Sequence, residues 1–382
     1  MSERLLVIFI DALPYYVAEA VPEAAFLHSL EHRGSLVPGV GFSINLWPEL
    51  FAGLTPDELG FFNTWTLRQS LWRAEPSYEP SWEPSAMSWV ARLVDRCTRR
   101  PQIASRALHK AYGHLTGQGN LANIPFCHLP FFERNMGDSA PLFDAYEQRG
   151  AVMVRHDKLQ GSSEQRDEQV YAEALSQIQA GRDVVVTFGN LDVVGHHWGP
   201  HSDRFYQQIV QFDDWCERLV DAFRSLHGRR ANVVICSDHG MAAVDQGVHL
   251  DLERHFGRLG LATYFYFQDS VMLRVWVKSP TLLREIGDFL AGLQYGELLD
   301  ASERQGYGVS SGEFGDLIFF LDEGKVFWPG WYGARFPAGM HGYHPELRSQ
   351  QAVFAYCGEQ IPPPLPTRSR EMEGFVRRLI GK

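Results

Sequence analysis

The chain has 382 residues, of which 45% are hydrophobic and 21% charged, a composition typical of a folded globular protein with a large core. Its formal net charge of −11 at pH 7 excludes a basic nucleic-acid-binding protein, because binding to a phosphate backbone requires a basic surface. The length allows two domains, but α/β folds often run long, so we expect one catalytic domain over residues 1–382 that carries insertions.

Short apolar runs recur along the chain, and each stops at polar or acidic residues. The runs are residues 5–10, 152–154, 184–188, 233–236 and 353–356. Runs that are apolar on both faces are typical of parallel strands covered by helices on both sides. Helical stretches such as residues 204–226 lie between them. This alternation predicts a doubly wound, mainly parallel α/β sheet with ligands at the carboxyl ends of its strands.

Two regions depart from this pattern. Residues 61–148 are rich in Trp, Phe and Pro and then carry a basic helical piece, which predicts a helical and aromatic cap insertion. Residues 258–330 alternate apolar and polar side chains, as in 262–267 and 271–277, which predicts a small antiparallel insertion.

Acidic residues and histidines stand where the apolar runs stop. Asp11 follows the first run, and Asp192 and His196 follow residues 184–188. Asp192 and His196 are four positions apart at a strand end, among glycines that let the backbone fold tightly around a cation. An isolated motif of this kind is equally typical of a surface turn with a helix-capping aspartate.

Two further segments carry such residues. Asp238 and His239 follow residues 233–236, and His341 lies in a G-M-H-G-Y segment near the end of the chain. Adjacent residues of a strand point to opposite faces, so Asp238 and His239 can share a ligand only after a bend, which Gly240 permits. Since parallel strand ends converge on one crevice, we expect all these groups to meet there.

Three carboxylates, three histidines and one serine hydroxyl give seven ligand groups. Seven groups are too many for one tetrahedral zinc ion and suit two open metal sites. Nitrogen and carboxylate oxygen ligands without thiolate favour Zn²⁺, with Mn²⁺ or Fe as alternatives.

These motifs resemble the alkaline phosphatase superfamily and, within it, the nucleotide pyrophosphatase and type I phosphodiesterase branch. The resemblance rests on D-x-x-G-H-x-x-G-P at residues 192–200, S-D-H-G-M at 237–241 and H-G-Y at 341–343, in the same order as in the branch. It implies a sheet of the alkaline phosphatase type and two divalent metal ions. One ion would be bound by Asp192, His196 and His341, and the other by Asp11, Asp238 and His239.

The resemblance also implies a nucleophile. In this branch a Thr or Ser lies ten residues before the glycine of a T-G-x-x-P-x-x-H-G stretch, which corresponds here to residues 52–60, so Ser43 is the predicted nucleophile and metal contact. Asn45 stands where the branch has proline, and Leu59 replaces its histidine. The asparagine that holds phosphate in relatives falls near Asn63, one residue off register, and Asn45 competes with it.

The predicted function is two-metal hydrolysis of a small phosphate ester or nucleotide-like substrate through a phosphoseryl-type intermediate. Phosphodiester or pyrophosphate bonds are favoured, because no motif recognisably supplies the extra positive charge that a monoester requires. A phosphomonoesterase of the same superfamily remains an alternative, as does a catalytically inactive metal-binding protein that recognises a phosphorylated partner. A sulfatase is disfavoured, because the sequence after Ser43 lacks the proline and arginine of the C/S-x-P-x-R pattern.

The five cysteines are an odd number without a C-x-x-C pair, so they predict neither a disulfide framework nor a zinc knuckle. We therefore expect a reducing, cytoplasmic location. No stretch approaches the roughly 20 apolar residues of a membrane helix, and we expect no membrane segment. The oligomeric state is not predicted.

Overall fold

The computed structural model describes residues 4–73, 132–134, 143–229, 231–328, 335–358 and 364–379. The chain forms two compact units. The first comprises residues 1–55, 138–244 and 337–382, and the second comprises residues 56–137 and 245–336. Most of the predicted cap insertion, with its basic helical piece, lies outside the described residues. The division into one catalytic domain with insertions at 61–148 and 258–330 stays a prediction.

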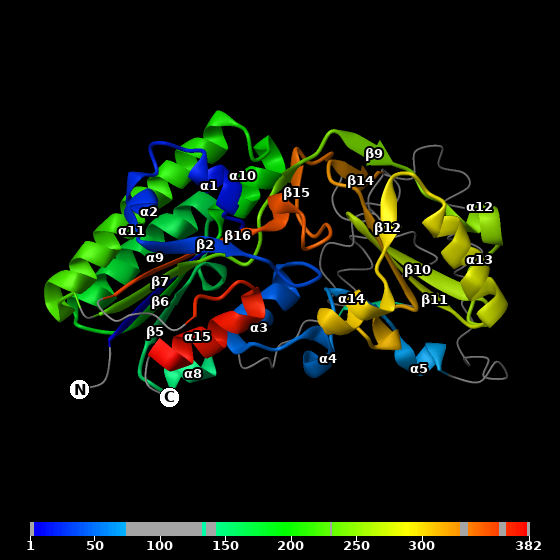
Figure 1. The fold of residues 1–382 in the computed structure, drawn as a ribbon, viewed down its shortest axis with the longest axis horizontal. Helices are drawn as coiled ribbons and strands as arrows, with labels where there is room; N and C mark the ends of the chain where they lie inside the picture. The colour runs from blue at the N-terminus through cyan, green and yellow to red at the C-terminus, as the bar shows by residue number, and fades with distance from the viewer. Residues whose placement is uncertain are drawn as a thin grey trace. The chain divides into compact units, whose positions relative to one another are not determined.

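The first unit is built on a six-stranded sheet (Figure 1). Its strands are Leu5–Ile10 (β1), His32–Leu36 (β2), Val152–Arg155 (β5), Val184–Phe188 (β6), Asn232–Cys236 (β7) and Ala352–Cys357 (β16). Their order is β2-β16-β7-β1-β6-β5. Strands β5, β6, β1 and β7 run parallel, whereas β16 is antiparallel to both of its neighbours. The predicted mainly parallel sheet is therefore confirmed.

Helices cover both faces of this sheet. The side chains of β1 are apolar on both faces, so each face packs against a separate core. Leu6 and Ile8 enter one core, and Val7 and Phe9 enter the other. The first core includes helices Tyr15–Glu19 (α1), Ala25–Ser29 (α2), Ser163–Gln179 (α9), Asn190–Trp198 (α10) and Asp203–His227 (α11). The second includes Ser43–Ala52 (α3), Asp144–Glu147 (α8) and Met372–Leu379 (α15). Figure 1 shows α9 and α11 on one side of the sheet and α3 and α15 on the other.

Short elements complete the first unit. They are the strands Ala242–Ala243 (β8) and Gly339–Met340 (β15), and the 3₁₀ helices His156–Lys158 (η2), Arg348–Gln350 (η4) and Ser369–Glu371 (η5). Strands β8 and β15 pair antiparallel, with Met340 opposite Ala242. This pairing joins the segment after β7 to the segment that carries His341.

The second unit contains a four-stranded antiparallel sheet. Its strands are Tyr264–Asp269 (β10), Met272–Val277 (β11), Gly296–Leu298 (β12) and Leu317–Leu321 (β13), in the order β10-β11-β13-β12. The antiparallel pairing predicted for residues 262–267 and 271–277 is confirmed. Two-stranded sheets join Trp65–Leu67 (β3) to Phe132–Arg134 (β4), and Gln246–Val248 (β9) to Lys325–Phe327 (β14).

Among its described residues, the second unit has the helices Pro56–Leu59 (α4), Gln69–Trp72 (α5), Leu252–Phe256 (α12), Pro280–Ala291 (α13) and Ala301–Gly306 (α14), with the 3₁₀ helix Gly312–Phe314 (η3). The core of this unit contains a fully buried ion pair, in which Arg274 Nε donates to Asp269 Oδ2 at 2.8 Å. Across both units, no helix in the described ranges combines the length and apolar character needed to span a bilayer.

Candidate metal centre

Three neighbouring strands of the first unit each deliver one carboxylate. Asp11 directly follows β1, Asp238 lies two residues beyond β7, and Asp192 lies in the first turn of α10, which follows β6. The Asp11 N–H donates to the Phe188 carbonyl at 3.0 Å, which extends the pairing of β1 and β6 up to the site. The predicted convergence at the carboxyl ends of the strands is confirmed.

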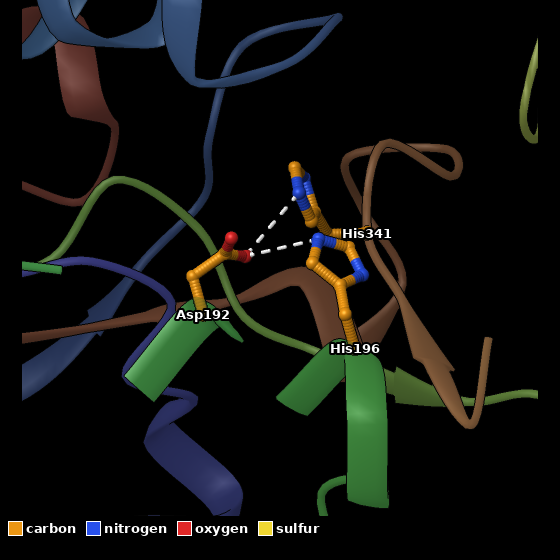
Figure 2. A group of neighbouring side chains, drawn as sticks. All are labelled: Asp192, His196 and His341. Carbon is orange, nitrogen blue, oxygen red and sulfur yellow. Dashed lines mark ion pairs between the residues drawn. The ribbon is translucent and has the colours of Figure 1, made fainter. Parts of the chain in front are cut away.

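Asp192 and His196 lie one turn apart on α10, so both side chains leave the same face of a helix (Figure 2). His196 Nε2 is 3.3 Å from Asp192 Oδ1, and His341 Nε2 is 3.5 Å from the same oxygen. The expectation of a tight glycine-shaped turn around this pair is therefore wrong. Gly195 serves packing instead, because a Cβ there would lie 2.7 Å from Met241 Cε.

The chain after β7 bends as predicted. His239 Nε2 lies 3.4 Å from Asp238 Oδ2 and 3.4 Å from Asp11 Oδ1, so the adjacent Asp238 and His239 face the same space. Gly240 is required by a close approach and not by a left-handed backbone, because a Cβ there would lie 2.0 Å from the Ser349 carbonyl oxygen.

Two of the histidines are oriented by backbone carbonyls. His196 Nδ1 lies 3.0 Å from the Gly339 carbonyl, and His239 Nδ1 lies 2.8 Å from the Gly240 carbonyl. A carbonyl only accepts, so each Nδ1 carries a proton, and Nε2 is the ring nitrogen that faces the carboxylates and would coordinate a cation. The ring of His341 stacks on that of His239, with centroids 3.7 Å apart and an interplanar angle of 9°.

The three carboxylates are crowded, and Asp238 is fully buried while Asp11 and Asp192 are partly buried. Burial, followed by the charges of Asp238 and Asp192, raises the pKa of Asp11 well above its ordinary value. Burial also raises the pKa of Asp238, although His239 acts in the opposite direction. Asp11 Oδ1, Asp192 Oδ1 and Asp238 Oδ2 are buried without a hydrogen-bond partner. Buried carboxylate oxygens without a hydrogen-bond partner are costly, and cations would offset their negative charge.

His196 and His341 have pKa values shifted in opposite directions. Burial favours neutral imidazole at His196, but Asp192 outweighs it and raises the pKa of His196 to about 9. In return, His196 and His341 hold the pKa of Asp192 below its ordinary value despite burial. Burial and the neighbouring His239 lower the pKa of His341 well below its usual range, so this ring is neutral at pH 7 and able to act as a ligand.

The donor atoms fit two divalent cations. One group comprises Asp192, His196 and His341, and another comprises Asp11, Asp192 and His239, with the ligand atoms of each group within 4.8 Å of one another. The first group is the set that the resemblance implied. In the second group Asp192 joins Asp11 and His239, while Asp238 Oδ2 also lies beside His239 Nε2.

Ser43 lies among these ligands. It is the first residue of α3, and its Oγ is 3.1 Å from His239 Nε2. The first N–H groups of a helix have no partner within the helix, so the amides of Ser43 and Ile44 are suited to an anion at this hydroxyl. The structure thus brings all seven predicted residues together, while the nucleophilic role of Ser43 stays a prediction.

The two candidate phosphate-binding asparagines differ in their surroundings. Asn45 is fully buried, where its Nδ2 donates to the Val40 carbonyl at 2.7 Å and its Oδ1 accepts the Phe42 N–H at 3.1 Å. These bonds fix the loop that precedes Ser43. Asn63 belongs to the second unit, is 2% exposed and has a φ of 68°, and its Nδ2 has no hydrogen-bond partner in the described part of the chain.

Comparison with known proteins identifies the family. The type I phosphodiesterase / nucleotide pyrophosphatase family matches residues 5–344. The chain belongs to this family. Its members typically hydrolyse phosphodiester or pyrophosphate bonds and use two metal ions, and the acidic and imidazole groups of this phosphodiesterase family member could hold a metal ion. No curated protein matches the chain in sequence.

Solved structures show the same fold. Murine ectonucleotide pyrophosphatase / phosphodiesterase 5, an inactive variant in complex with AMP, superposes with a TM-score of 0.60 at 15% identity, over 99% of this chain and 95% of that chain. The human protein of the same name gives 0.61 at 13% identity with the same coverage. The predicted alkaline phosphatase type of fold is confirmed.

Two residues of this family member support the ligands without belonging to the predicted site. Ser237 Oγ accepts the Leu13 N–H at 2.9 Å and donates to the His239 carbonyl at 3.1 Å, which fixes the bend after β7. Gln350 Oε1 accepts the N–H groups of Gly342 and Tyr343 and so holds the loop after His341. Ser237 is the first residue of the S-D-H-G-M motif, whereas nothing in the sequence marks Gln350.

Proposed function

We propose that this chain is a two-metal hydrolase of phosphodiester or pyrophosphate bonds in small nucleotide-like substrates, with Ser43 as nucleophile. The observation that carries the proposal is the position of Ser43 Oγ, 3.1 Å from His239 Nε2 at the start of α3. A hydroxyl at a helix N-terminus beside a cluster of carboxylates and imidazoles can attack a phosphate whose charge is neutralised. Zn²⁺ is the proposed ion, because the ligands are imidazole nitrogen and carboxylate oxygen.

The chain's residues have defined tasks in this reaction. Bound cations would lower the pKa of the Ser43 hydroxyl and neutralise the phosphate. Ser43 Oγ then forms a bond to phosphorus as the bond to the leaving oxygen breaks, and the amides at the start of α3 donate to the non-bridging oxygens. Water next cleaves the phosphoseryl bond, which restores the hydroxyl. Asp192, His196 and His341 would hold one cation, and Asp11, Asp238 and His239 the other, with Asp192 close enough to contribute to both.

Asn63 is, with Asn45, one of the two candidates that the family resemblance offers for a further contact with phosphate. Its Nδ2 has no hydrogen-bond partner among the described residues, whereas the amide of Asn45 already fixes the loop before α3. Asn63→Ala should raise KM for a diester with little effect on bound metal. An equal loss of metal would instead indicate a structural role.

The proposal is tested by metal analysis together with hydrolysis of bis-p-nitrophenyl phosphate and p-nitrophenyl phosphate. We expect two ions per chain, a faster rate with the diester, and a drop of about 10³-fold or more in Ser43→Ala with its metals retained. Ser162→Ala is the matched control, because Ser162 is the serine N-cap of α9 and lies outside the metal centre.

Each result discriminates between the alternatives. A Ser43→Ala variant with full activity would show that the nucleophile is wrong. Preference for the monoester would favour the phosphomonoesterase alternative. Wild-type protein that binds metal but turns over neither compound would favour an inactive protein that recognises a phosphorylated partner.

A further inference from the structure

The N-terminus of α10 is capped by a residue from another helix. Its own N-cap, Gly189, offers no side chain. Asp167 of α9 takes this role: its Oδ1 accepts the Gly189 N–H at 3.0 Å, and its Oδ2 accepts the Asn190 N–H at 2.8 Å. Asp167 is 1% exposed, so water competes little for these bonds.

Asp167 is itself held by His156, which lies in η2 directly after β5. His156 Nδ1 donates to Asp167 Oδ1 at 2.6 Å, and the His156 N–H donates to Thr187 Oγ1 at 3.1 Å. Its ring lies against the backbone of Gly189, where a Cβ would be only 2.8 Å from His156 Cδ2. Ser163 Oγ is 3.4 Å from His156 Nε2, a longer contact. The shorter hydrogen bonds of this pair are therefore those to Thr187 of β6 and to the amides at the start of α10.

We propose that Asp167 and His156 are positioning residues for the metal ligands on α10. Asp192 lies two residues beyond Asn190, so any displacement of the first turn of the helix would move its carboxylate. His196 is fixed independently through its bond to the Gly339 carbonyl, so a misplaced first turn would change the distance between the two ligands. Neither positioning residue belongs to the ligand groups. This inference rests on the proposed function, because it assumes that Asp192 and His196 bind a cation.

The chain supplies a matched control for this role. Asp213 of α11 also caps another helix, accepting the N–H groups of Phe26 and Leu27 at 3.0 and 2.7 Å. It is 6% exposed, and the helix that it caps, α2, carries none of the candidate site residues. Replacement of either aspartate removes a buried two-bond cap, but only Asp167 leads to the metal centre.

The test compares Asp167→Ala with Asp213→Ala in the full chain by chelator competition for Zn²⁺ and by the visible spectrum of the Co²⁺-loaded protein. We expect Asp167→Ala to bind the more weakly held ion about 10- to 100-fold less tightly and to change the Co²⁺ spectrum. Asp213→Ala should lose thermal stability while its metal affinity and spectrum stay those of the wild type. Equal metal affinity in the two variants would overturn the proposal.

A second readout does not depend on metal. Amide hydrogen exchange should accelerate in residues 189–196 of Asp167→Ala, and only around α2 in Asp213→Ala. His156→Asn, which keeps a donor near the position of Nδ1, should stay closer to wild type than His156→Ala in both readouts. Unchanged exchange in residues 189–196 would overturn the positioning role alone. Wild-type protein without bound metal, but with accelerated exchange in Asp167→Ala, would overturn the proposed function and the assignment to metal ligands.

Discussion

Asp192 is the carboxylate that both candidate metal groups share. Its Oδ1 lies 3.3 Å from His196 Nε2 and 3.5 Å from His341 Nε2, and it also belongs to the group with Asp11 and His239. This sharing was absent from the expectation based on resemblance, which gave each metal a separate set. We therefore expect Asp192 to contribute to the binding of both ions.

We predict that Asp192→Ala binds less than one metal ion per chain, whereas His196→Ala keeps about one. The reason is that Asp192 contributes to two groups and His196 to one. Metal content after dialysis against a weak chelator is the measurement. Retention of one ion by Asp192→Ala would show that Asp192 serves a single site.

Glu49 carries a second prediction, which concerns pH. It lies on α3 with its carboxylate packed against Gly39, and burial raises its pKa from 4.5 to about 7, although Arg370 and Arg368 oppose the shift. Between these pH values the folded chain keeps a proton that the unfolded chain has lost. The stability contributed by neutral Glu49 is therefore complete below about pH 4.5 and is lost as the pH rises to about 7.

Glu49→Gln stays neutral, so its free energy of unfolding should exceed that of the wild type by up to about 3 kcal/mol at pH 8 and match it near pH 4.5. Urea unfolding at both pH values measures the difference. The control is Glu31→Gln, at an exposed position, for which we expect no such pH-dependent gain. A constant difference between Glu49→Gln and wild type across this range would contradict the prediction.

Individual site residues were predictable to the extent that they stand in short motifs at strand ends. Asp192, His196, Asp238, His239 and His341 all do so, and Asp11 closes the first apolar run. Asp167 and His156 lie in segments without such a motif, because their role depends on α9 and η2 meeting the start of α10 in space. Contacts between residues so distant in sequence leave no local pattern.

At the scale of elements, the strands were predicted well because buried parallel strands are apolar on both faces. The local structure of the ligand segments was not, since α10 contains Gly195 and is flanked by Gly189 and Gly199, and these glycines suggest a loop. Packing contacts explain two of these glycines: His156 lies against Gly189, and Met241 lies against Gly195. Tertiary contact thus overrode the low helix propensity of glycine.

The pair Arg274 and Asp269 links three elements of the second unit. Besides its bond to Asp269, the guanidinium donates to the carbonyls of Phe62 and Trp65, and so joins β11 to β10 and to the segment that enters β3. Both charged side chains are fully buried. Removing one partner of such a pair leaves the other charge in a dry environment.

We predict that Arg274→Met lowers the free energy of unfolding by about 3–5 kcal/mol, the usual result of breaking a buried pair. Hydrogen exchange should accelerate in β10 and β11. The double variant Arg274→Met with Asp269→Leu should recover part of the loss, because no lone charge stays buried. A double variant less stable than Arg274→Met would show that the carbonyl bonds of Arg274, and not the ion pair, dominate.

At the scale of the whole molecule, the chain passes between its two units at residues 55–56, 137–138, 244–245 and 336–337. All seven candidate site residues lie in the first unit, while Asn63 lies in the second. Sequence patterns revealed the sheet of each unit but not the boundaries between the units. The amino-acid composition does not change at residues 245 or 336, where the chain passes from one unit to the other.

We therefore expect metal removal to destabilise the first unit and not the second. A ligand that binds only the folded state stabilises it, by about 4 kcal/mol at a concentration 1,000 times its Kd. We predict that a strong chelator lowers the Tm and accelerates exchange in β1, α10 and the segment after β7, while β10 and β11 keep their protection. Equal loss of protection in both units would indicate that they unfold as one.

The neighbouring strands β7, β1 and β6 set the spacing of the three aspartates in the candidate metal centre. Neighbouring strands are about 4.8 Å apart, and paired catalytic cations are about 3.5–4 Å apart, so the spacing of the strands is close to the spacing of two such cations. Asp11 directly follows β1, and Asp238 and Asp192 lie two and four residues beyond β7 and β6, so the three short side chains start from segments anchored to adjacent strands. The backbone therefore sets the spacing of the three aspartates. We expect this spacing to stay unchanged when one divalent ion replaces another.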